Sequence, residues 1–423
     1  MRQLITADLM LDGQGGVTHG AAVLLEGARI LDAGRAADLG QPEGVALTAL
    51  PPGSTLLPGL IDSHVHLAWS GAHSPATIMQ ERLGLSFAAM ALQGLAHAQA
   101  SLVYGVTALR DMAAPGGTII DLRDAIASGH ATGPRIVACG RGLTVTGGHM
   151  DPPGLPDHLR LDGVHHPCNG PDAFRAGARA ELKRGADFVK INACVSRHDR
   201  PGIWWRPEMT AAEISAACDE AEMQGTYVAA HTSGGPPLTE TVRCGVKCVE
   251  HAHWIEDACI EIMAHQGTWL VPTLSVNERT FDLAAHDPEA PEPSDWSKAA
   301  REAKWHSLEK ARKAGISVGA GTDAGFMIPH GHLYWRELQL LVEGGFSELQ
   351  AISSATSVNA DILGIDAGRI APERKADLLA VAGNPLEDIA LLSDAARLTV
   401  WLGGTMVAKA GRLLPPVIER TAW

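Results

Sequence analysis

The stretch GLIDSHVHLAW, residues 59–69, has the composition of a short apolar strand but carries two histidines, His64 and His66, with one residue between them. Successive side chains of a strand point to opposite faces, so the two imidazoles share one face while Val65 points the other way. Such a pair either binds a metal ion or lies on a solvated face. The rest of the sequence has to decide between these two interpretations.

The composition predicts a globular chain with a large apolar core. Of 423 residues, 46% are hydrophobic and 19% are charged. A net charge of −14, without a cluster of Lys and Arg, argues against nucleic acid as a partner. No stretch approaches the roughly 18 apolar residues of a membrane span, and the first residues do not resemble a secretory signal. Seven cysteines without a CxxC pair are typical of reduced thiols, so we expect a cytoplasmic protein.

Eight short apolar segments, each followed by a helical pattern, indicate the fold. Continuous apolar strands that alternate with helices are typical of a parallel sheet, and eight units in series favour an α/β fold of the (β/α)8 TIM-barrel type over an open sheet. The expected strands are residues 59–67, 105–112, 134–141, 186–193, 226–233, 246–254, 268–274 and 316–325.

The two ends of the chain have a different pattern. Both alternate apolar and polar residues between glycine-containing turns, which predicts short antiparallel strands. We therefore expect residues 1–56 and 366–423 to form one small β-sandwich domain, and residues 57–365 to form the barrel. Residues 284–297, rich in Pro, Asp and Glu, are expected to form a long loop, either a lid or a solvated connection.

Polar side chains recur within or at the ends of these apolar segments. Each alone has an ordinary explanation, such as a hydrogen-bonded core histidine, an ion-paired lysine or a turn-forming aspartate. The carboxyl ends of all strands in such a barrel meet at one face. The polar side chains, taken together, therefore predict a metal site at that face. The residues are His64, His66, Lys190, His231, His251 and Asp323.

Charge balance narrows the kind of metal site. Two divalent cations close together repel each other, and neutral imidazoles cannot offset that repulsion. Asp323 supplies one negative charge. Lys190 supplies another if CO2 converts its amine to a carbamate, a reaction that a buried lysine with a lowered pKa favours. The interpretation of His64 and His66 as metal ligands is therefore preferred.

The segments HVH, VKIN, AAHTSG, VEHAHW and GTDAG resemble the amidohydrolase superfamily, and most closely its prolidase-like and imidazolonepropionase-related branch. The resemblance covers nearly the whole chain. It implies a binuclear centre, with zinc as the expected metal, and a homo-oligomeric assembly. His64, His66 and Asp323 would hold one ion, His231 and His251 the other, and N6-carboxylated Lys190 would bridge them together with a hydroxide.

The same resemblance implies the roles of two catalytic residues. Asp323 would take a proton from the bridging hydroxide and pass it to the leaving amine. The segment GLTVTGGHMDP, residues 142–152, is similar to a TGGH segment of prolidase-like relatives, in which a histidine lies over the substrate carbonyl. His149 is therefore either the donor to the developing oxyanion or an ordinary turn residue.

Two segments depart from the prolidase-like pattern. Such relatives usually carry AYTP after the fifth-strand histidine, whereas this chain has AHTSGGPPL and no tyrosine. After the fourth strand, NACVSRHDRPGIWWRPE brings arginines and tryptophans over the barrel mouth, where they would clamp a carboxylate and stack on a flat group, or pack as a surface loop. The candidate substrate-binding residues are Arg197, His198, Trp204, Trp205 and His253.

The sequence thus predicts a metal-dependent hydrolase that cleaves the amide bond of a dipeptide, an N-acyl amino acid or a similar carboxamide, including an aryl acyl-phenylalanine. The departures weaken Xaa-Pro dipeptides as the substrate. A mononuclear deaminase or a hydrolase that opens a cyclic amide is the alternative, and Lys190 distinguishes the two. Lactone or phosphoester hydrolysis stays open, whereas a non-catalytic scaffold is disfavoured because every ligand position is filled.

Overall fold

Parallel strands alternate with helices through the middle of the chain. The structure is a computed structural model that describes residues 2–40, 44–72, 75–149, 151, 163, 165–196, 202–286 and 292–415. One sheet has the order β6-β7-β8, with β6 Leu60–Val65, β7 Val106–Asp111 and β8 Arg135–Ala138. A second has the order β10-β9-β11-β14-β15-β16, with β9 Leu143–Thr144, β10 His166–Pro167, β11 Val189–Asn192, β14 Val228–Gly234, β15 Cys248–Trp254 and β16 Trp269–Val271. The predicted α/β class is confirmed.

Residues 316–325, expected as the eighth strand, form isolated bridges rather than a regular strand. One parallel bridge joins this segment to β16 and another joins it to β6, so the segment lies between the two sheets. Gly321 passes so close to β6 that an added Cβ would lie 2.8 Å from His64 Cβ. The glycines that permit this approach also interrupt the regular strand, so the prediction was wrong in this detail. The arrangement is consistent with a TIM-barrel-type domain.

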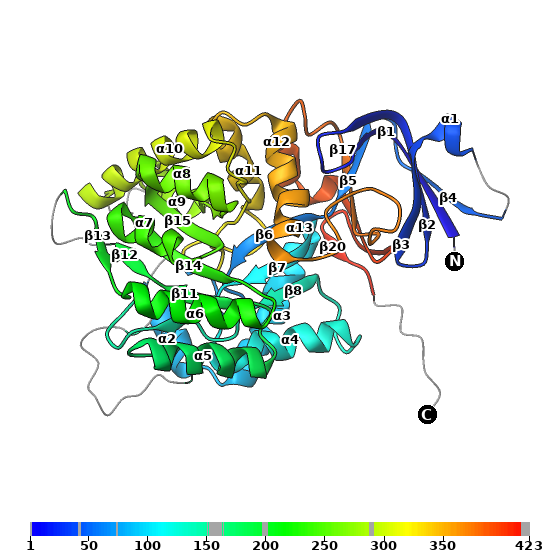
Figure 1. The fold of residues 1–423 in the computed structure, drawn as a ribbon. Coiled ribbons are helices and arrows are strands. Elements are labelled where there is room, and N and C mark those ends of the chain that lie inside the picture. Colours follow the sequence, from blue (N-terminus) through cyan, green and yellow to red (C-terminus); the bar gives the residue numbers. More distant parts are fainter. Residues whose placement is uncertain are drawn as a thin grey trace, which may run out of the picture.

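Helices flank these strands (Figure 1). Several begin at side-chain caps: for example, Ser86 accepts a hydrogen bond from Ala89 N, and Thr210 forms a capping box with Glu213. The helices are α1 Ala36–Leu39, α2 Pro75–Gly84, α3 Phe87–Val103, α4 Thr118–Ala127, α5 Pro171–Arg184, α6 Ala211–Met223, α7 Gly235–Arg243, α8 Asp257–Gln266, α9 Leu274–His286, α10 Asp295–Lys313, α11 Tyr334–Glu343, α12 Glu348–Ser353 and α13 Asn359–Leu363, with 3-10 turns at Pro115–Gly117, Ile389–Ser393 and Ala395–Arg397 and a π-helical turn at Ser354–Val358. A short antiparallel hairpin joins β12 Cys194–Ser196 to β13 Trp205–Pro207.

The two chain ends share one sheet at the side of the molecule (Figure 1). Its order is β20-β19-β18-β17-β5-β1-β2-β3, with β4 also paired to β1, and β17 from the C-terminal segment pairs antiparallel with β5. That these strands pack as a sandwich stays a prediction, as do the proposed domain boundaries. The strands are β1 Arg2–Leu11, β2 Val17–Glu26, β3 Arg29–Arg35, β4 Ala46–Ala49, β5 Ser54–Pro58, β17 Leu378–Ala382, β18 Leu398–Leu402, β19 Thr405–Lys409 and β20 Arg412–Leu413.

Apolar side chains form two separate clusters. The larger fills the α/β part and continues onto the terminal sheet at Leu57 and Val400, and the smaller lies on that sheet around Ile5, Leu56 and Trp401. Burial of this apolar surface is the main force that stabilises both parts. None of the described helices is both long and apolar enough to cross a membrane.

Candidate active site

One cavity of about 230 Å³ gathers the predicted metal ligands. His64 and His66 come from the end of β6, and the other four from β11, β14, β15 and the glycine-rich segment 316–325. Trp69, Met112 and Phe326 add apolar wall, and His149 joins the lining. The cavity residues with a predicted role are His64, His66, His149, Lys190, His231, His251 and Asp323. The structure therefore brings together side chains that are up to 259 positions apart in the sequence, counting from His64 to Asp323.

The Asp323 carboxylate faces three of these histidines. Its Oδ1 lies 3.3 Å from His66 Nε2 and 3.5 Å from His64 Nε2, and its Oδ2 lies 4.0 Å from His251 Nδ1. One ligand atom each from His64, His251 and Asp323 lies within 4.8 Å of the others. His64 Nε2 is buried and accepts no hydrogen bond in the described part of the chain. A buried lone pair beside a carboxylate and further imidazoles fits a divalent cation.

The imidazoles form a continuous row across the cavity. The ring centroids of His64 and His251 are 4.8 Å apart, those of His251 and His231 4.5 Å, and those of His231 and His149 4.0 Å in a stacked arrangement. Burial lowers the pKa of His64 to about 4, and it lowers the pKa values of His231 and His251 well below the ordinary value. Neutral imidazoles keep a lone pair for a metal ion.

Lys190 lies on β11 with its side chain in the same cavity. The residue is 4% exposed, and burial lowers the pKa of its amine. No hydrogen bond of Lys190 Nζ occurs among the described residues, and burial outweighs the attraction of the Glu250 and Asp323 carboxylates for the ammonium form. The neutral amine is the form that reacts with CO2. The environment thus suits the expected carbamate, which stays a prediction.

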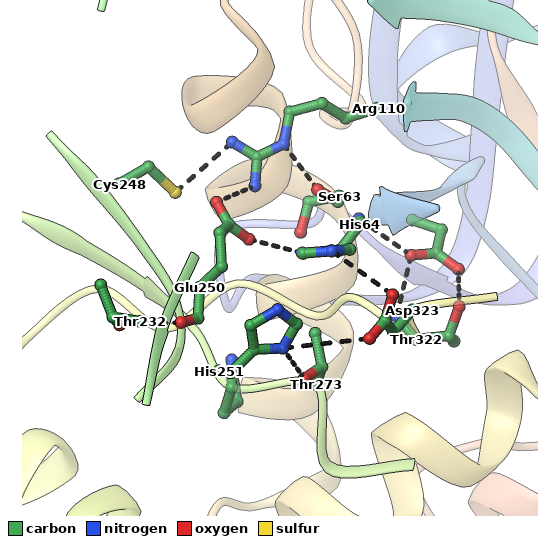
Figure 2. Close-up of polar contacts among 12 residues, drawn as sticks. Ser63, His64, Arg110, Thr232, Cys248, Glu250, His251, Thr273, Thr322 and Asp323 are labelled. Carbon is green, nitrogen blue, oxygen red and sulfur yellow. Dashed lines mark hydrogen bonds and ion pairs between the residues drawn. The ribbon is translucent and has the colours of Figure 1, made fainter. Parts of the chain in front are cut away.

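A buried carboxylate that the sequence did not single out contacts His64, the first predicted ligand. Glu250 Oε2 accepts a hydrogen bond from His64 Nδ1 at 2.7 Å, and its Oε1 accepts one from Arg110 Nη2 at 2.7 Å (Figure 2). Burial alone would raise the pKa of Glu250, but Arg110 and His64 lower it to about 2. The ionised carboxylate keeps the proton on His64 Nδ1 and leaves Nε2 free to bind a metal ion.

Glu250 and His251 are consecutive in sequence, so regular alternation would send them to opposite faces. The pairing of β14 with β15 becomes irregular here, and His251 adopts a φ of +66°. This local distortion brings both side chains to the same site. The signal for Glu250 in the sequence is its place inside an apolar strand, where an ionised side chain requires a partner.

His149 follows β9 and lies against the ring of His231. Its backbone N–H donates to Glu208 Oε2 at 2.8 Å, and Arg206 Nη2 donates to Glu208 Oε1 at 2.7 Å. The side chain of Glu208 is 2% exposed. The backbone at His149 is therefore held by Glu208, directly after β13, and His149 lines the cavity.

A second cavity of about 450 Å³ adjoins the first and shares His149, His231, His251 and Asp323 with it. His253, a predicted substrate-binding residue, lines it and is 6% exposed. Trp296 also lines it, with its ring centroid 5.4 Å from that of His253. Trp296 was not predicted because its segment has the composition of a loop, whereas α10 begins at Asp295.

Of the other predicted substrate-binding residues, the two that the structure describes, Trp204 and Trp205, do not line these two cavities. Trp205 packs against Gly235, and its ring centroid lies 5.8 Å from that of Trp254. Trp204 is half-buried and absent from the described lining of both cavities. Arg197 and His198 lie outside the described residues, as do residues 287–291 of the expected long loop. Helix α9 extends to His286, so the gap between α9 and α10 is shorter than expected.

Comparison with known proteins yields one family and several relatives. The family model described as "Amidohydrolase family" matches residues 55–407. Ochratoxinase of Aspergillus niger is 28% identical over 96% of this chain and 87% of its own length, and its crystal structure superposes with a TM-score of 0.85. A crystal structure of a Xaa-Pro dipeptidase with bound methionine is 30% identical, with a TM-score of 0.82 over 96% of this chain and 99% of the other. Imidazolonepropionase of Micrococcus luteus is 27% identical over 64% of this chain and 66% of its own.

Proposed function

The chain belongs to the amidohydrolase family, as the sequence predicted, and on this premise we propose that it is a metal-dependent hydrolase of the C–N bond of a small carboxamide, either a dipeptide or an N-acyl amino acid. A hydrolase of amide bonds is what the family and its prolidase-like and ochratoxinase relatives support. The observation that carries the finer proposal is the single cavity that holds five strand-end ligands together with Lys190.

Two divalent ions, with zinc as the expected metal, fit this set of donors. His64, His66 and Asp323 would hold one ion and His231 and His251 the other, with Lys190 as an N6-carboxylated bridge. Bound ions would supply Lewis acidity and a water of lowered pKa. The negative charges of Asp323 and a carbamate, with Glu250 immediately behind His64, support two cations at one site.

The protein's own residues would then move the proton and orient the substrate. Asp323 would accept a proton from the attacking water and then return it to the leaving amine. His149 would donate a hydrogen bond to the carbonyl oxygen as negative charge develops there. Its backbone anchor on Glu208 keeps the ring beside His231, in reach of the shared cavity.

The shape of the site supports a substrate with two halves. The reacting bond would lie at the residues that both cavities share, so that one half occupies each cavity. His253 and Trp296 offer flat surfaces in the second cavity, which suits an aromatic or other planar group. The relative named ochratoxinase and the Xaa-Pro dipeptidase are consistent with a small amide as the substrate.

Several further features belong to the same proposal. The strands would close into a complete (β/α)8 barrel over residues 57–365, with residues 1–56 and 366–423 as a separate β-sandwich. The protein would act in the cytoplasm as a homo-oligomer. Size-exclusion chromatography with light scattering checks the last point.

The experiment is a substrate panel on the purified full chain, stripped of metal with a chelator and then reloaded with zinc. The panel contains dipeptides, N-acetyl and N-benzoyl amino acids, a cyclic imidazolone and two aminated heterocycles. We expect zinc-dependent release of free amino acids from the amides. Ring opening or ammonia release without amide hydrolysis would overturn the proposal and support the relationship to imidazolonepropionase instead.

A further inference from the structure

A buried threonine with unusual backbone geometry contacts one of the proposed ligands. Thr273 follows β16, is fully buried and has a φ of +47°, a conformation that β-branched residues rarely adopt. Its Oγ1 lies 2.7 Å from His251 Nδ1. Such a conformation persists only where surrounding contacts hold it, and it often serves a site. The contacts that hold Thr273 are therefore of interest.

The carbonyl groups of this turn are held by a buried lysine from α10. Lys304 is 3% exposed, and its Nζ donates to Pro272 O at 2.6 Å and to Thr273 O at 3.2 Å. A third hydrogen bond goes to Asn277 Oδ1. An ammonium has three donors, so all of them are used. Burial of an ammonium group without hydrogen-bond acceptors would cost free energy. The three acceptors, two of them carbonyls of this turn, therefore fix the position of Lys304.

The amide groups of the same turn are held by a buried glutamate from α11. Glu337 is fully buried and accepts hydrogen bonds from Leu274 N at 2.9 Å, Ser275 N at 2.7 Å and Ser275 Oγ at 2.5 Å. Lys304 and Glu337 thus hold opposite hydrogen-bonding groups of residues 272–275. Two helices, α10 and α11, thus fix one turn that contacts His251, a residue of the cavity lining.

We infer that Lys304 and Glu337 are positioning residues, which hold the turn after β16 so that Thr273 orients the His251 imidazole for metal binding. The inference rests on the proposed function in that His251 is taken as a ligand. With Nδ1 engaged by the hydroxyl, the ring is fixed and Nε2 is the nitrogen left for an ion. The two helices thereby act on the metal site without touching it.

The same lysine also supports the second cavity through a separate contact. Asn277 Oδ1 accepts from Lys304 and lies 3.2 Å from His253 Nε2, so His253 donates through this nitrogen. The Asn277 amide oxygen therefore links Lys304 to the second cavity through His253.

The test measures zinc affinity of the metal-free full chain by competition with a chromophoric chelator. Thr273→Val removes the hydroxyl at nearly constant shape, whereas Thr273→Ser keeps it. We expect Thr273→Val and Lys304→Met to weaken at least one zinc site about 10–100-fold, the range for loss of an outer partner of a ligand. Thr273→Ser should stay within about threefold of the wild type, an allowance for context-dependent scatter.

A matched control lies on the same helix. Lys310 donates to Ile255 O at 3.1 Å and pairs with Asp257 at 2.6 Å, away from the cavity. Lys310→Met should leave zinc affinity unchanged. In the Thr273→Val background, Lys304→Met should add little further loss of affinity, because both act through one hydroxyl. Urea unfolding of the metal-free variants reports stability separately.

Two outcomes would overturn the inference and leave the proposed function intact. One is a wild-type zinc affinity in Thr273→Val, which remains informative even if Lys304→Met does not fold. The other is a full additional loss in the double variant, which would give Lys304 a general role in stability. An enzyme that binds zinc as expected but hydrolyses no amide would overturn the proposed function and leave this inference standing. A wild type with no affinity for zinc would overturn both.

Discussion

Glu250 accepts a hydrogen bond from His64 at 2.7 Å, and both side chains are fully buried beside the cavity. Arg110, also fully buried, donates to the other carboxylate oxygen (Figure 2). The carboxylate therefore balances a buried guanidinium and fixes the protonated nitrogen of a proposed ligand at the same time. Glu250, one residue before the proposed ligand His251, therefore has a defined role in holding His64 and Arg110.

Removal of the Glu250 charge should weaken metal binding. Glu250→Gln keeps the size of the side chain but no longer holds His64 with an ionised acceptor, so we expect about a 10–100-fold loss of zinc affinity. Glu256→Gln, at the exposed start of α8, is the control and should bind zinc as the wild type does. An unchanged zinc affinity in Glu250→Gln would show that His64 does not depend on this carboxylate.

Loss of the His149 side chain should slow the reaction more than it weakens substrate binding. If the imidazole stabilises the developing oxyanion, His149→Ala lowers kcat by about 10²–10³-fold, with a small change in KM. Steady-state kinetics on the best amide of the panel measure this split, and His130→Ala, at an exposed position, is the control. A normal kcat with a raised KM would instead assign His149 to substrate binding.

The stability of the α/β part should depend on pH through Glu181. Its side chain accepts hydrogen bonds from Arg141 and His166. Burial alone would raise the pKa of Glu181, but these partners lower it below the ordinary 4.5 overall. A depressed carboxyl pKa stabilises the fold above the unfolded value, and this contribution disappears as the pH falls through the folded value.

Glu181→Gln should therefore lower the free energy of unfolding at pH 7 by about 1.5–3 kcal/mol, the range for hydrogen bonds to a charged group. Urea unfolding at pH 7 and at pH values below about 4 measures the difference between the variant and the wild type. The difference should shrink in acid. A constant difference at all pH values would mean that the loss comes from packing and not from ionisation.

The overall arrangement was predictable because its signals are local. Apolar segments separated by helical patterns indicate parallel strands, and seven of the eight appear where they were expected. The eighth segment does not form a regular strand. Its Gly321 instead passes close to His64, where a side chain would not fit. A glycine in a strand segment signals such an approach, but only its neighbour in space shows which requirement prevails.

The proposed ligands were predictable because strand ends converge at one face, whereas their supports were not. Arg110 and Glu250 lie on different strands, β7 and β15. Each is a buried charge whose partner becomes known only when the two strands are placed in the fold. The φ of +66° at His251, which places it beside Glu250, has no local signal in the sequence. Trp296 reaches the second cavity from the start of α10, within a segment rich in turn-forming residues. These features depend on tertiary contacts between distant segments.

The most direct test of the account is the zinc content per subunit, measured by elemental analysis together with amide hydrolysis, in the wild type and in Lys190→Ala. Lys190 is buried in the cavity and supplies the bridging anion only if it is carboxylated. We expect about two zinc ions per wild-type subunit, the number that the binuclear reading requires. In Lys190→Ala, zinc content and hydrolysis should fall together, and a short carboxylic acid added to the buffer should restore part of both. One zinc ion or fewer in the wild type, with hydrolysis unaffected by Lys190→Ala, would contradict the account.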